Sequence, residues 1–450
     1  MIQKLFNILF KNKPDYSEQA VIIPRTDHCI SRKHINPHAV KVLYRLHDAG
    51  FAAYLVGGGV RDLLLGKTPK DFDVATDAKP EEVKKLFRNC LLIGRRFRIA
   101  HVRFGHDIIE VTTFRAGSAR GDDERSHSKL GMLLRDNVYG TIGEDAVRRD
   151  FTINAFYYNI ADFSVTDFLN GMQDLQDKVI RLIGKPSVRY QEDPVRLLRA
   201  VRFAAKLNFT LHEDTEKPIE KSAKLLVHVA PARLFDEFLK LFFYGHARNT
   251  YFLLEKYGLL QYLLPIYSEK TVSNVQIFIE QALIKTDERV DNDQSVNPAF
   301  LLAAFLWPKF NETLESFKGA RINAALATQK SLTKVLNSNE LPMAIPKRLT
   351  EIIRDIWTLQ WRFSQLVRHQ AVFVSLHKRF RAGYDFLVLR AASDPTLLEA
   401  AAWWTHFQAS EHAEQQLLLE QLPLAPKPKK RYKSRKKPLG KKDSVHSTGE

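Results

Sequence analysis

The sequence predicts an α+β protein with a small α/β head, an all-helical neck and body, and a disordered basic tail. Between residues 37 and 170, short strand patterns alternate with amphipathic helical patterns. From residue 171 onward the pattern is helical, with few strand signals. Near the end, KPKKRYKSRKKPLGKK contains no acidic residue and little apolar content, which indicates an unfolded cationic segment. We therefore expect an N-terminal arm (1–36), the head (37–170), the neck (171–240), the body (241–420) and the tail (421–450).

The composition indicates a folded protein of several domains in a reducing compartment. The chain has 450 residues, 45% of them hydrophobic, which is enough for a large core. Its two cysteines, Cys29 and Cys90, do not supply a disulfide framework or a structural zinc site. The first residues lack a secretory pattern, and no stretch has the roughly 20 apolar residues of a transmembrane segment. The sequence therefore favours a cytoplasmic protein.

The positive charge is concentrated in the tail. The net charge is +17, and residues 427–442 hold ten Lys or Arg, which leaves +7 for the rest. One interpretation is that the tail only keeps the protein soluble. The density of cations favours a second interpretation, a nonspecific arm that binds nucleic-acid phosphates. The residues expected to bind RNA are Lys427, Lys429, Lys430, Arg431, Lys433, Arg435, Lys436 and Lys437.

The expected elements follow in a simple order. In the head we predict helices at 36–50, 60–66 and 79–87, and strands at 51–58, 72–76, 98–104 and 107–114. Residues 116–140, which are rich in Gly, Ser and charged side chains, are expected to form a mobile loop. Beyond the head, the clearest helical patterns are at 194–207, 232–245 and 297–310.

The stretch GGGVRDLLLGKTPKDFDVATDA, residues 57–78, carries two separate signals for phosphate chemistry. Gly66-Lys67-Thr68 resembles the end of a P-loop, but Arg61 stands where the first glycine of that motif belongs, so Gly66 is expected to end a short helix instead. Gly57 and Gly58 lie between a strand and a helix, where backbone N–H groups can bind a triphosphate. Arg61 follows one helical turn later, as a further candidate for nucleotide binding.

Acidic residues on predicted strands form a candidate metal site. Asp71 and Asp73 are two positions apart, so both carboxylates leave the same face while the residues between and after them enter the core. Glu110 lies on a second predicted strand and is the third candidate ligand. A solvated strand edge would explain an isolated pair of this kind. Next to the glycine turn, the pair favours Mg²⁺, which binds one or two carboxylates together with substrate phosphates.

Together these motifs resemble the DNA polymerase beta-like nucleotidyltransferases, whose signature is Gly-Gly followed about a dozen residues later by Asp-x-Asp. Two later segments, RRDFTINAFYYN (148–159) and EDPVRLLRAVRFAAKL (192–207), are similar to the class II branch, which contains bacterial poly(A) polymerases and CCA-adding enzymes. The likeness extends from about residue 31 to about residue 401. It implies a polymerase beta-like head, followed by helical domains that bind nucleotide and RNA.

The resemblance also implies roles for individual residues. Asp71 and Asp73 would hold two Mg²⁺ ions, with Mn²⁺ as the alternative metal, and ATP would be the substrate. Asp150 would join them as a catalytic residue, although it could simply cap a helix. Asp193, expected as an N-cap with Pro194 at the first helical position, would read the base together with Arg196. The remaining residues expected to bind nucleotide are Arg148, Arg149, Asn154 and Arg199.

The implied reaction is template-independent addition of AMP from ATP to RNA 3′ ends. Three stretches favour the bacterial poly(A) polymerases within the branch: VIIPRTDHCISRKHINPHAVKVLYRL, NPAFLLAAFLWP and IPKRLTEIIRDIW, together with the basic end. A CCA-adding enzyme is the first alternative, and an RNA-binding protein with a retired catalytic head is the second. The expected partners are the 3′ ends of mRNA and other transcripts, bound with little sequence specificity, and the RNA-decay machinery.

Overall fold

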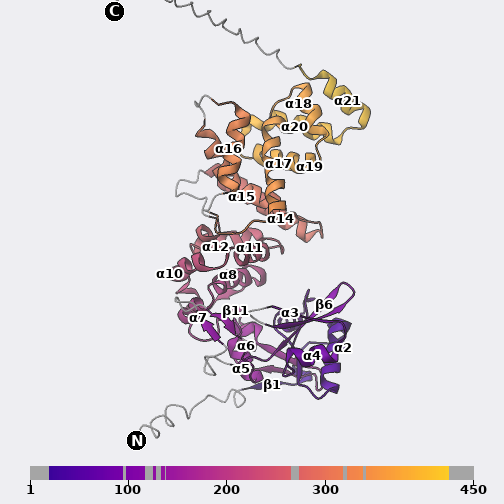
Figure 1. Cartoon of the computed structure of the whole chain (residues 1–450), viewed down its shortest axis with the longest axis vertical. Coiled ribbons are helices and arrows are strands. Elements are labelled where there is room, and N and C mark those ends of the chain that lie inside the picture. Colours follow the sequence, from indigo (N-terminus) through magenta and orange to yellow (C-terminus); the bar gives the residue numbers. More distant parts are fainter. Residues whose placement is uncertain are drawn as a thin grey trace, which may run out of the picture. The chain divides into compact units, whose positions relative to one another are not determined.

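The computed structural model describes residues 20–94, 98–116, 125–127, 133–136, 138–264, 273–317, 322–337 and 341–424 (Figure 1). Its contacts divide the chain into two compact units, Met1–Arg354 and Asp355–Glu450. The predicted neck and most of the predicted body therefore share the first unit. The predicted boundaries at residues 170 and 240 stay predictions.

The head is built on a mixed sheet of eight strands. Their order is β1-β10-β9-β2-β3-β6-β5-β4, and β3 pairs with β6 in parallel while all other pairs are antiparallel. The central position of β2, β3 and β6 places the predicted acidic residues in the middle of the sheet. The strands are β1 (Val21–Ile23), β2 (Ala53–Val56), β3 (Asp73–Thr76), β4 (Cys90–Ile93), β5 (Ile99–Phe104), β6 (Asp107–Thr113), β9 (Phe156–Asn159) and β10 (Val165–Asp167).

Of the helices in the head, α2 and α4 lie where the sequence predicts, whereas α3 begins two residues before its predicted start and α5 was not predicted. In α2 (Pro37–Asp48), the Asn36 side chain accepts a hydrogen bond from the N–H of His38, and proline occupies the first turn. Its buried side chains recur at helical spacing and pack on β2, β3 and β6. The other helices are α3 (Gly58–Leu64), α4 (Pro80–Leu86) and α5 (Ile142–Arg148), with the 3₁₀ turn η3 (Thr152–Asn154) before β9.

Gly66 ends α3, as the sequence predicts. Its φ of 68° is a left-handed conformation that glycine adopts at little cost. The N–H groups of Gly66 and Lys67 donate to the carbonyls of Leu63 and Asp62, so the last turn of the helix is closed by its own backbone. The Gly-Lys-Thr sequence is therefore a helix end and not a phosphate loop.

Two segments that were expected to be irregular contain short paired strands within the described residues. The predicted arm contributes β1, which pairs with β10 at the edge of the sheet, and two 3₁₀ turns, η1 (Arg25–Asp27) and η2 (Arg32–His34). The segment expected to be a mobile loop contains β7 (Arg125–His127) and β8 (Leu133–Asp136), which pair with each other. Strands of three or four residues are too short to produce a clear alternating pattern.

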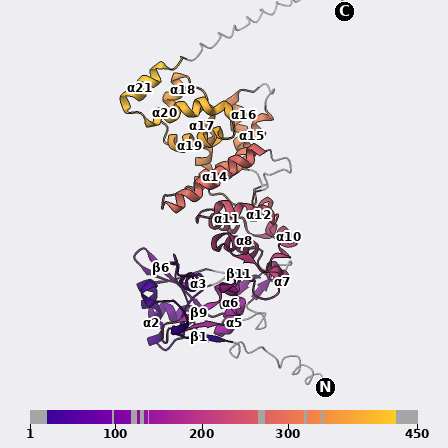
Figure 2. The same ribbon diagram turned by 180° about the vertical axis from the view of Figure 1, so that it is seen from behind.

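The first unit continues as a series of helices after the sheet. Helix α8 packs against α11 and α12, and α14 packs against α12 and α15 (Figure 2). The short strands β11 (Val179–Ile180) and β12 (Thr210–Leu211) pair in parallel. The helices are α6 (Gly171–Gln176), α7 (Pro186–Glu192), α8 (Val195–Leu207), α9 (Glu213–Glu216), α10 (Ile219–Ser222), η4 (Ala223–His228), α11 (Pro231–Phe242), α12 (Ala247–Lys256), α13 (Leu260–Leu263), α14 (Ser273–Asp291), α15 (Pro298–Glu315) and α16 (Ala324–Leu336).

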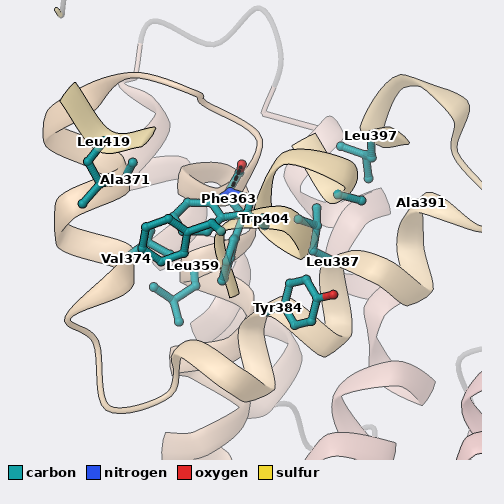
Figure 3. Packing of buried hydrophobic residues seen from close by; sticks show 12 residues of the cluster. Leu359, Phe363, Ala371, Val374, Tyr384, Leu387, Ala391, Leu397, Trp404 and Leu419 are labelled. Carbon is teal, nitrogen blue, oxygen red and sulfur yellow. Dashed lines mark hydrogen bonds between the residues drawn. The ribbon is translucent and has the colours of Figure 1, made fainter. Parts of the chain in front are cut away.

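The second unit has a core of its own. Trp404 is fully buried, and its indole N–H donates to the carbonyl of Phe363 at 3.0 Å (Figure 3). Phe363, Leu387 and Val374 pack around it with no exposed surface. Its elements are the end of α17 (Lys347–Phe363), α18 (Arg368–Ser375), α19 (Phe380–Ala391), η5 (Pro395–Leu397), α20 (Leu398–Ala409) and α21 (His412–Gln421). Among the helices described, none is long and apolar enough to cross a membrane.

Candidate active site

The glycine turn lies between β2 and α3, as predicted. Gly57 has a φ of 72°, and a Cβ atom there would lie 3.3 Å from Nη1 of Arg149. A Cβ atom on Gly59 would lie 3.2 Å from the carbonyl oxygen of Asp71. Side chains at these positions would thus crowd the arginine or displace the segment that carries the first aspartate. The glycines allow the turn, a cation and the acidic residues to approach one another closely.

Asp71 and Asp73 are arranged as the strand pattern predicts. Phe72 and Val74 are buried, while Asp71 is exposed and Asp73 is half-buried at the start of β3. Alternation along the strand therefore puts both carboxylates on the side away from the core.

Glu110 is the direct neighbour of Asp73 in the sheet. Asp73 pairs with Val56 of β2 on one side and with Glu110 of β6 on the other. Burial raises the pKa of Asp73 to about 6, and the negative charges of Glu110 and Asp71 act in the same direction, while Arg149 opposes them. The three acidic residues therefore form one electrostatic cluster.

This cluster fits a hard divalent cation that also binds a substrate. Among the residues that the structure describes, no three His, Cys, Asp or Glu side chains form a preformed metal cage. A Mg²⁺ site completed by phosphate oxygens needs only one or two carboxylates, so Asp71 and Asp73 suffice. Glu110 lies 3.3 Å from Nε2 of His101. Its role as a third ligand stays a prediction.

Arg149 is one of two arginines whose guanidinium groups lie beside the glycine turn, the other being Arg61. Its Nε donates to the hydroxyl of Tyr157 at 2.9 Å, and Nη2 donates to Oδ2 of Asp145 at 3.1 Å. The Tyr157 hydroxyl donates to the same Asp145 oxygen at 2.7 Å. These contacts hold the guanidinium in one orientation, with Nη1 beside Gly57, where a bound phosphate would meet it.

Arg61 is placed differently from the sequence expectation. Only 2% of this residue is exposed, and its guanidinium contacts Oδ1 of Asp62 at 2.6 and 2.8 Å and Oδ1 of Asn154 at 2.6 Å. It also lies over the ring of Phe203 in α8, 5.1 Å from the ring centre. A guanidinium enclosed in this way links α3 to Asn154 and α8. It also lies beside Gly58, and its contact with a bound nucleotide stays a prediction.

Asp150 connects the head to helix α8. Its Oδ2 accepts a hydrogen bond from Nε of Arg199 at 2.7 Å, and its Oδ1 accepts from the N–H of Phe151 and from Nδ2 of Asn154. Burial alone would raise the pKa of Asp150, but Arg199 and these hydrogen bonds outweigh it, and the pKa lies below the usual range. Asn154 thus joins Arg61 to Asp150 in one buried polar chain.

Arg189 was not predicted, yet it organises the arginine segment. One of its nitrogens, Nη2, donates to the carbonyls of Arg148 and Arg149 at 2.7 and 2.6 Å. The carbonyl of Arg189 accepts from Nη1 of Arg196 at 2.7 Å, and the same nitrogen lies 3.1 Å from Glu192. Arg189 and Arg196 therefore link α7 and α8 to the segment that carries Arg148 and Arg149.

Arg233 is a second residue that the sequence reasoning missed. Its Nη1 and Nη2 donate to Oδ1 and Oδ2 of Asp193 at 2.7 and 2.8 Å, a two-pronged ion pair between α11 and the start of α8. Helix α8 begins at Val195 with Pro194 as its N-cap, one residue later than predicted. The Oδ1 of Asp193 still accepts from the N–H of Val195, at 3.4 Å.

A weak sequence signal could have pointed to Arg233. It lies in the first turn of α11, where the helix dipole disfavours a positive charge unless an anion is close. Arg189 gave a still weaker signal, a spacing of three to Glu192 on a short helix. Neither signal identifies the main contact of the arginine. Arg233 binds Asp193, which is distant in the sequence, and Arg189 binds backbone carbonyls.

A cavity and the predicted RNA-binding residues of the tail do not belong to this site. A cavity of about 670 Å³ is lined by residues around Leu182, Gly184 and His212 and includes none of the acidic cluster, so cavity volume does not mark this site. The predicted RNA-binding residues from Lys427 to Lys437 lie outside the described residues.

Comparisons with protein-family models match three parts of the chain. Residues 53–181 match the "Poly A polymerase head domain", which covers the glycine turn, the acidic cluster and the arginine segment. Residues 208–270 match a "Probable RNA and SrmB-binding site of polymerase A", and residues 320–437 match a "Polymerase A arginine-rich C-terminus".

Similarity to curated relatives extends over nearly the whole chain. The chain is 51% identical over 433 residues to poly(A) polymerase I of Salmonella typhi, covering 92% of this chain and 93% of the relative. A CCA-adding enzyme of Lactobacillus helveticus is 40% identical over 213 residues, which is 47% of this chain and 51% of that enzyme. The Bacillus stearothermophilus CCA-adding enzyme in complex with CTP superposes with a TM-score of 0.51 at 25% identity, covering 86% and 82% of the two chains. The chain belongs to the bacterial poly(A) polymerase I family.

Proposed function

We propose that this protein is a polynucleotide adenylyltransferase that adds AMP from ATP to RNA 3′ ends without a template. The observation that carries the proposal is the joint position of Asp71 and Asp73, the Gly57 turn and Arg149. It combines two carboxylates for a divalent cation with backbone N–H groups and a fixed guanidinium for phosphates. The similarity to poly(A) polymerase I supports AMP as the group that is transferred.

In the proposed reaction, the RNA 3′ oxygen attacks the α-phosphorus of ATP and pyrophosphate leaves from the opposite side. Asp71 and Asp73 would hold the divalent cation, with Mg²⁺ expected and Mn²⁺ as the alternative. When bound, the cation neutralises phosphate charge and favours ionisation of the 3′ hydroxyl. Arg149 would bind the triphosphate in the orientation that Tyr157 and Asp145 impose on it. The protein thus contributes position and charge more than proton transfer.

Asp193 and Arg196 remain our proposed base-reading residues. Both are already engaged in the protein, Asp193 with Arg233 and Arg196 with Glu192 and the carbonyl of Arg189. Such contacts fix the orientation of both side chains. Side chains held in one orientation favour one base, because a mismatched base would leave buried polar groups unpaired. Arg148 and Arg199 would complete the nucleotide site.

The extended identity to poly(A) polymerase I favours this function over CCA addition, since the CCA-adding relative matches about half of the chain. RNA 3′ ends are the proposed second substrate, in keeping with the RNA-binding family segment at residues 208–270. Interaction with the RNA-decay machinery and a cytoplasmic location remain predictions from the sequence.

The decisive experiment offers the protein Mg²⁺, one labelled nucleotide and a generic RNA. We expect a ladder of added AMP with ATP and far less incorporation with CTP, GTP or UTP. Two alternatives make different predictions. Preferred CTP addition to tRNA that lacks its CCA end would identify a CCA-adding enzyme, while RNA retention without any incorporation would identify a retired catalytic head. Asp71→Ala and Asp73→Ala are expected to abolish AMP transfer and leave RNA binding nearly intact.

A further inference from the structure

Tyr244 is an exposed aromatic residue on a well-fixed turn between α11 and α12. It is 41% exposed. The next residue, Gly245, has a φ of 81°, which suits glycine and sets the turn. On the far side, Asp287 accepts hydrogen bonds from the N–H groups of Ala247 and Arg248 at 2.7 and 3.0 Å, so the start of α12 is held by α14. The ring therefore has a defined position although it faces solvent.

Two cations flank this ring, and one of them adjoins the acidic cluster. The Nζ of Lys70 lies 5.1 Å from the ring centre, and the guanidinium carbon of Arg202 lies 5.4 Å from it. Lys70 directly precedes Asp71, whereas Arg202 lies on α8. Tyr244 thus reaches from the helical part of the unit to the segment that carries the proposed metal ligand.

The surroundings of the ring are unusually rich in positive charge. Burial lowers the pKa of Arg202 below the usual range, and the charges of Arg199 and Arg61 act in the same direction, while the nearby carboxylate of Glu237 opposes them. Its Nε atom is buried and has no hydrogen-bond partner among the described residues. Lys206, one turn further along α8, is partly exposed and contacts Asp62 at 3.4 Å. An exposed aromatic ring among cations is the arrangement that proteins use to bind single-stranded nucleic acids.

We propose that the Tyr244 ring stacks on the base of the last nucleotide of the RNA, whose 3′ hydroxyl attacks ATP. Lys70 and Arg202 face the phosphate on the 5′ side of that nucleotide. This assignment rests on the proposed function, and it adds a positioning residue for the second substrate. It differs from the nucleotide site, which lies around Gly57, Arg149 and α8.

Stacking suits the demands of repeated addition. Every base has an aromatic face, so a stacking contact accepts any 3′ end, in contrast to hydrogen bonds to base edges. After each transfer the added adenosine becomes the new terminal nucleotide and meets the same ring. A fixed Tyr244 would therefore hold the 3′ hydroxyl at a constant position relative to Asp71 through many cycles.

The alternative role for Tyr244 is purely structural, a cation–π contact that links Lys70 to α8. The two roles differ in what a substitution changes. A structural link is lost in Lys70→Met as well as in Tyr244→Ala, and its loss alters melting temperature and the KM for ATP together. A stacking platform needs the ring, so Tyr244→Phe and Tyr244→Trp retain it whereas Tyr244→Leu does not.

The test places 2-aminopurine at the 3′ end of an RNA oligonucleotide and measures its fluorescence with the full-length protein and Mg²⁺, without ATP. Stacking on Tyr244 is expected to quench the terminal probe. Tyr244→Ala and Tyr244→Leu should lose this quenching and raise the KM for RNA roughly ten-fold or more, while Tyr244→Phe and Tyr244→Trp stay near the wild-type values. A probe placed eight nucleotides upstream serves as the control and should respond equally in all variants.

Quenching of the terminal probe that stays at the wild-type level in Tyr244→Ala would overturn the proposal. A loss of quenching in Lys70→Met as large as the loss in Tyr244→Ala would overturn it too. If the alanine and leucine variants fail to fold, cross-linking of the wild-type protein to RNA tests the proposal instead. RNA with 4-thiouridine at its 3′ terminus is cross-linked and the site mapped by mass spectrometry. A cross-link at Tyr244 or an adjacent residue supports the assignment, and one elsewhere refutes it. Normal AMP incorporation with failed quenching would refute the stacking alone and leave the proposed function in place.

Discussion

At the scale of single residues, Asp73 is a carboxylate whose surroundings disfavour its charged form. Its position in the centre of the sheet, between Val56 and Glu110, is fixed by strand pairing. Burial and the neighbouring charges raise its pKa to about 6, so the charged form is disfavoured in the folded protein without metal. Substrate-bound cations would relieve this crowding.

We predict that Asp73→Asn stabilises the metal-free protein while it abolishes AMP transfer. A carboxyl group with a raised folded-state pKa contributes fully to stability below its usual pKa, and that contribution is lost as the pH rises through about 6. The variant should therefore gain about 1–3 kcal/mol over the wild type at pH 7.5 and almost nothing below pH ~4. Chemical denaturation at both pH values, with EDTA present, measures the gain.

Asp77→Asn is the matched control for this prediction, because Asp77 is an exposed carboxylate directly after β3. It should change the free energy of unfolding by less than about 0.5 kcal/mol at either pH. Mg²⁺ should raise the melting temperature of the wild type and the control more than that of Asp73→Asn. A gain in Asp73→Asn that is equal at both pH values would show that charge crowding is not its cause.

A second residue-scale prediction concerns Arg196. Because its guanidinium is oriented by Glu192 and the Arg189 carbonyl, Arg196→Ala should weaken discrimination between ATP and the other nucleotides more than it slows ATP transfer at saturation. We expect the ratio of kcat/KM for ATP to that for CTP to fall roughly ten-fold or more. Steady-state kinetics with all four nucleotides provide the ratio. Equal losses for the four would make Arg196 a phosphate-binding or structural residue.

At the scale of elements, the sequence predicted what depends on local chemistry and missed what depends on distant partners. The capped start of α2, the end of α3 at Gly66 and the alternation that buries Phe72 and Val74 were predicted correctly. Glu110 was expected as a third candidate metal ligand, but its direct pairing with Asp73 was not predicted. The strand β1 was missed because three residues carry no period.

The arginines of the candidate site show the same limit of prediction from sequence. Their number predicted a phosphate-binding surface, but a guanidinium can equally hold two elements together, and the sequence does not separate these roles. The structure assigns Arg61, Arg189 and Arg233 to links with Asn154, backbone carbonyls and Asp193, and leaves Arg149 beside the glycine turn. Burial and partner identity decide the role, and both are tertiary properties.

The link between Asp150 and Arg199 is the element-scale contact that we expect to matter most. It joins the segment before η3 to α8, and Asp150 is buried. Arg199→Met should lower the free energy of unfolding by about 1–3 kcal/mol, since it leaves a buried carboxylate without its cation. Because the pKa of Asp150 is lowered, this contribution is present at neutral pH and is lost as the pH falls below ~4.

A double-mutant cycle separates the ion pair from other effects of these residues. Asp150→Asn together with Arg199→Met should be less destabilised than the sum of the single variants, by about 1 kcal/mol or more. The cycle is measured by urea denaturation at pH 7.5 and repeated at pH 3.5, where the coupling should shrink. Additive effects at neutral pH would show that the two side chains act independently in the folded protein.

At the scale of the whole molecule, charge is distributed unevenly along the chain. Residues 427–442 hold ten of its Lys and Arg residues. The segment that matches the family's arginine-rich C-terminus ends at residue 437, so it covers only part of this basic stretch. The described chain ends at Leu424, and the carbonyl of Pro423 still accepts a hydrogen bond from the N–H of Arg368. A clean truncation therefore begins at residue 425, after this last described contact.

We predict that deletion of residues 425–450 leaves thermal melting unchanged but weakens RNA binding in a salt-dependent way. No described core side chain is removed, so the fold should persist. Each cation that contacts a phosphate of single-stranded RNA adds about 0.7 to the slope of log affinity against log salt, and the truncated protein should show a shallower slope. A full-length variant with the ten cations replaced by Gln or Ser controls for chain length and should behave like the truncation. At saturating RNA both should transfer AMP at close to the full-length rate, because Asp71 and Asp73 are untouched. An unaltered slope in both variants would exclude RNA as the partner of this basic segment.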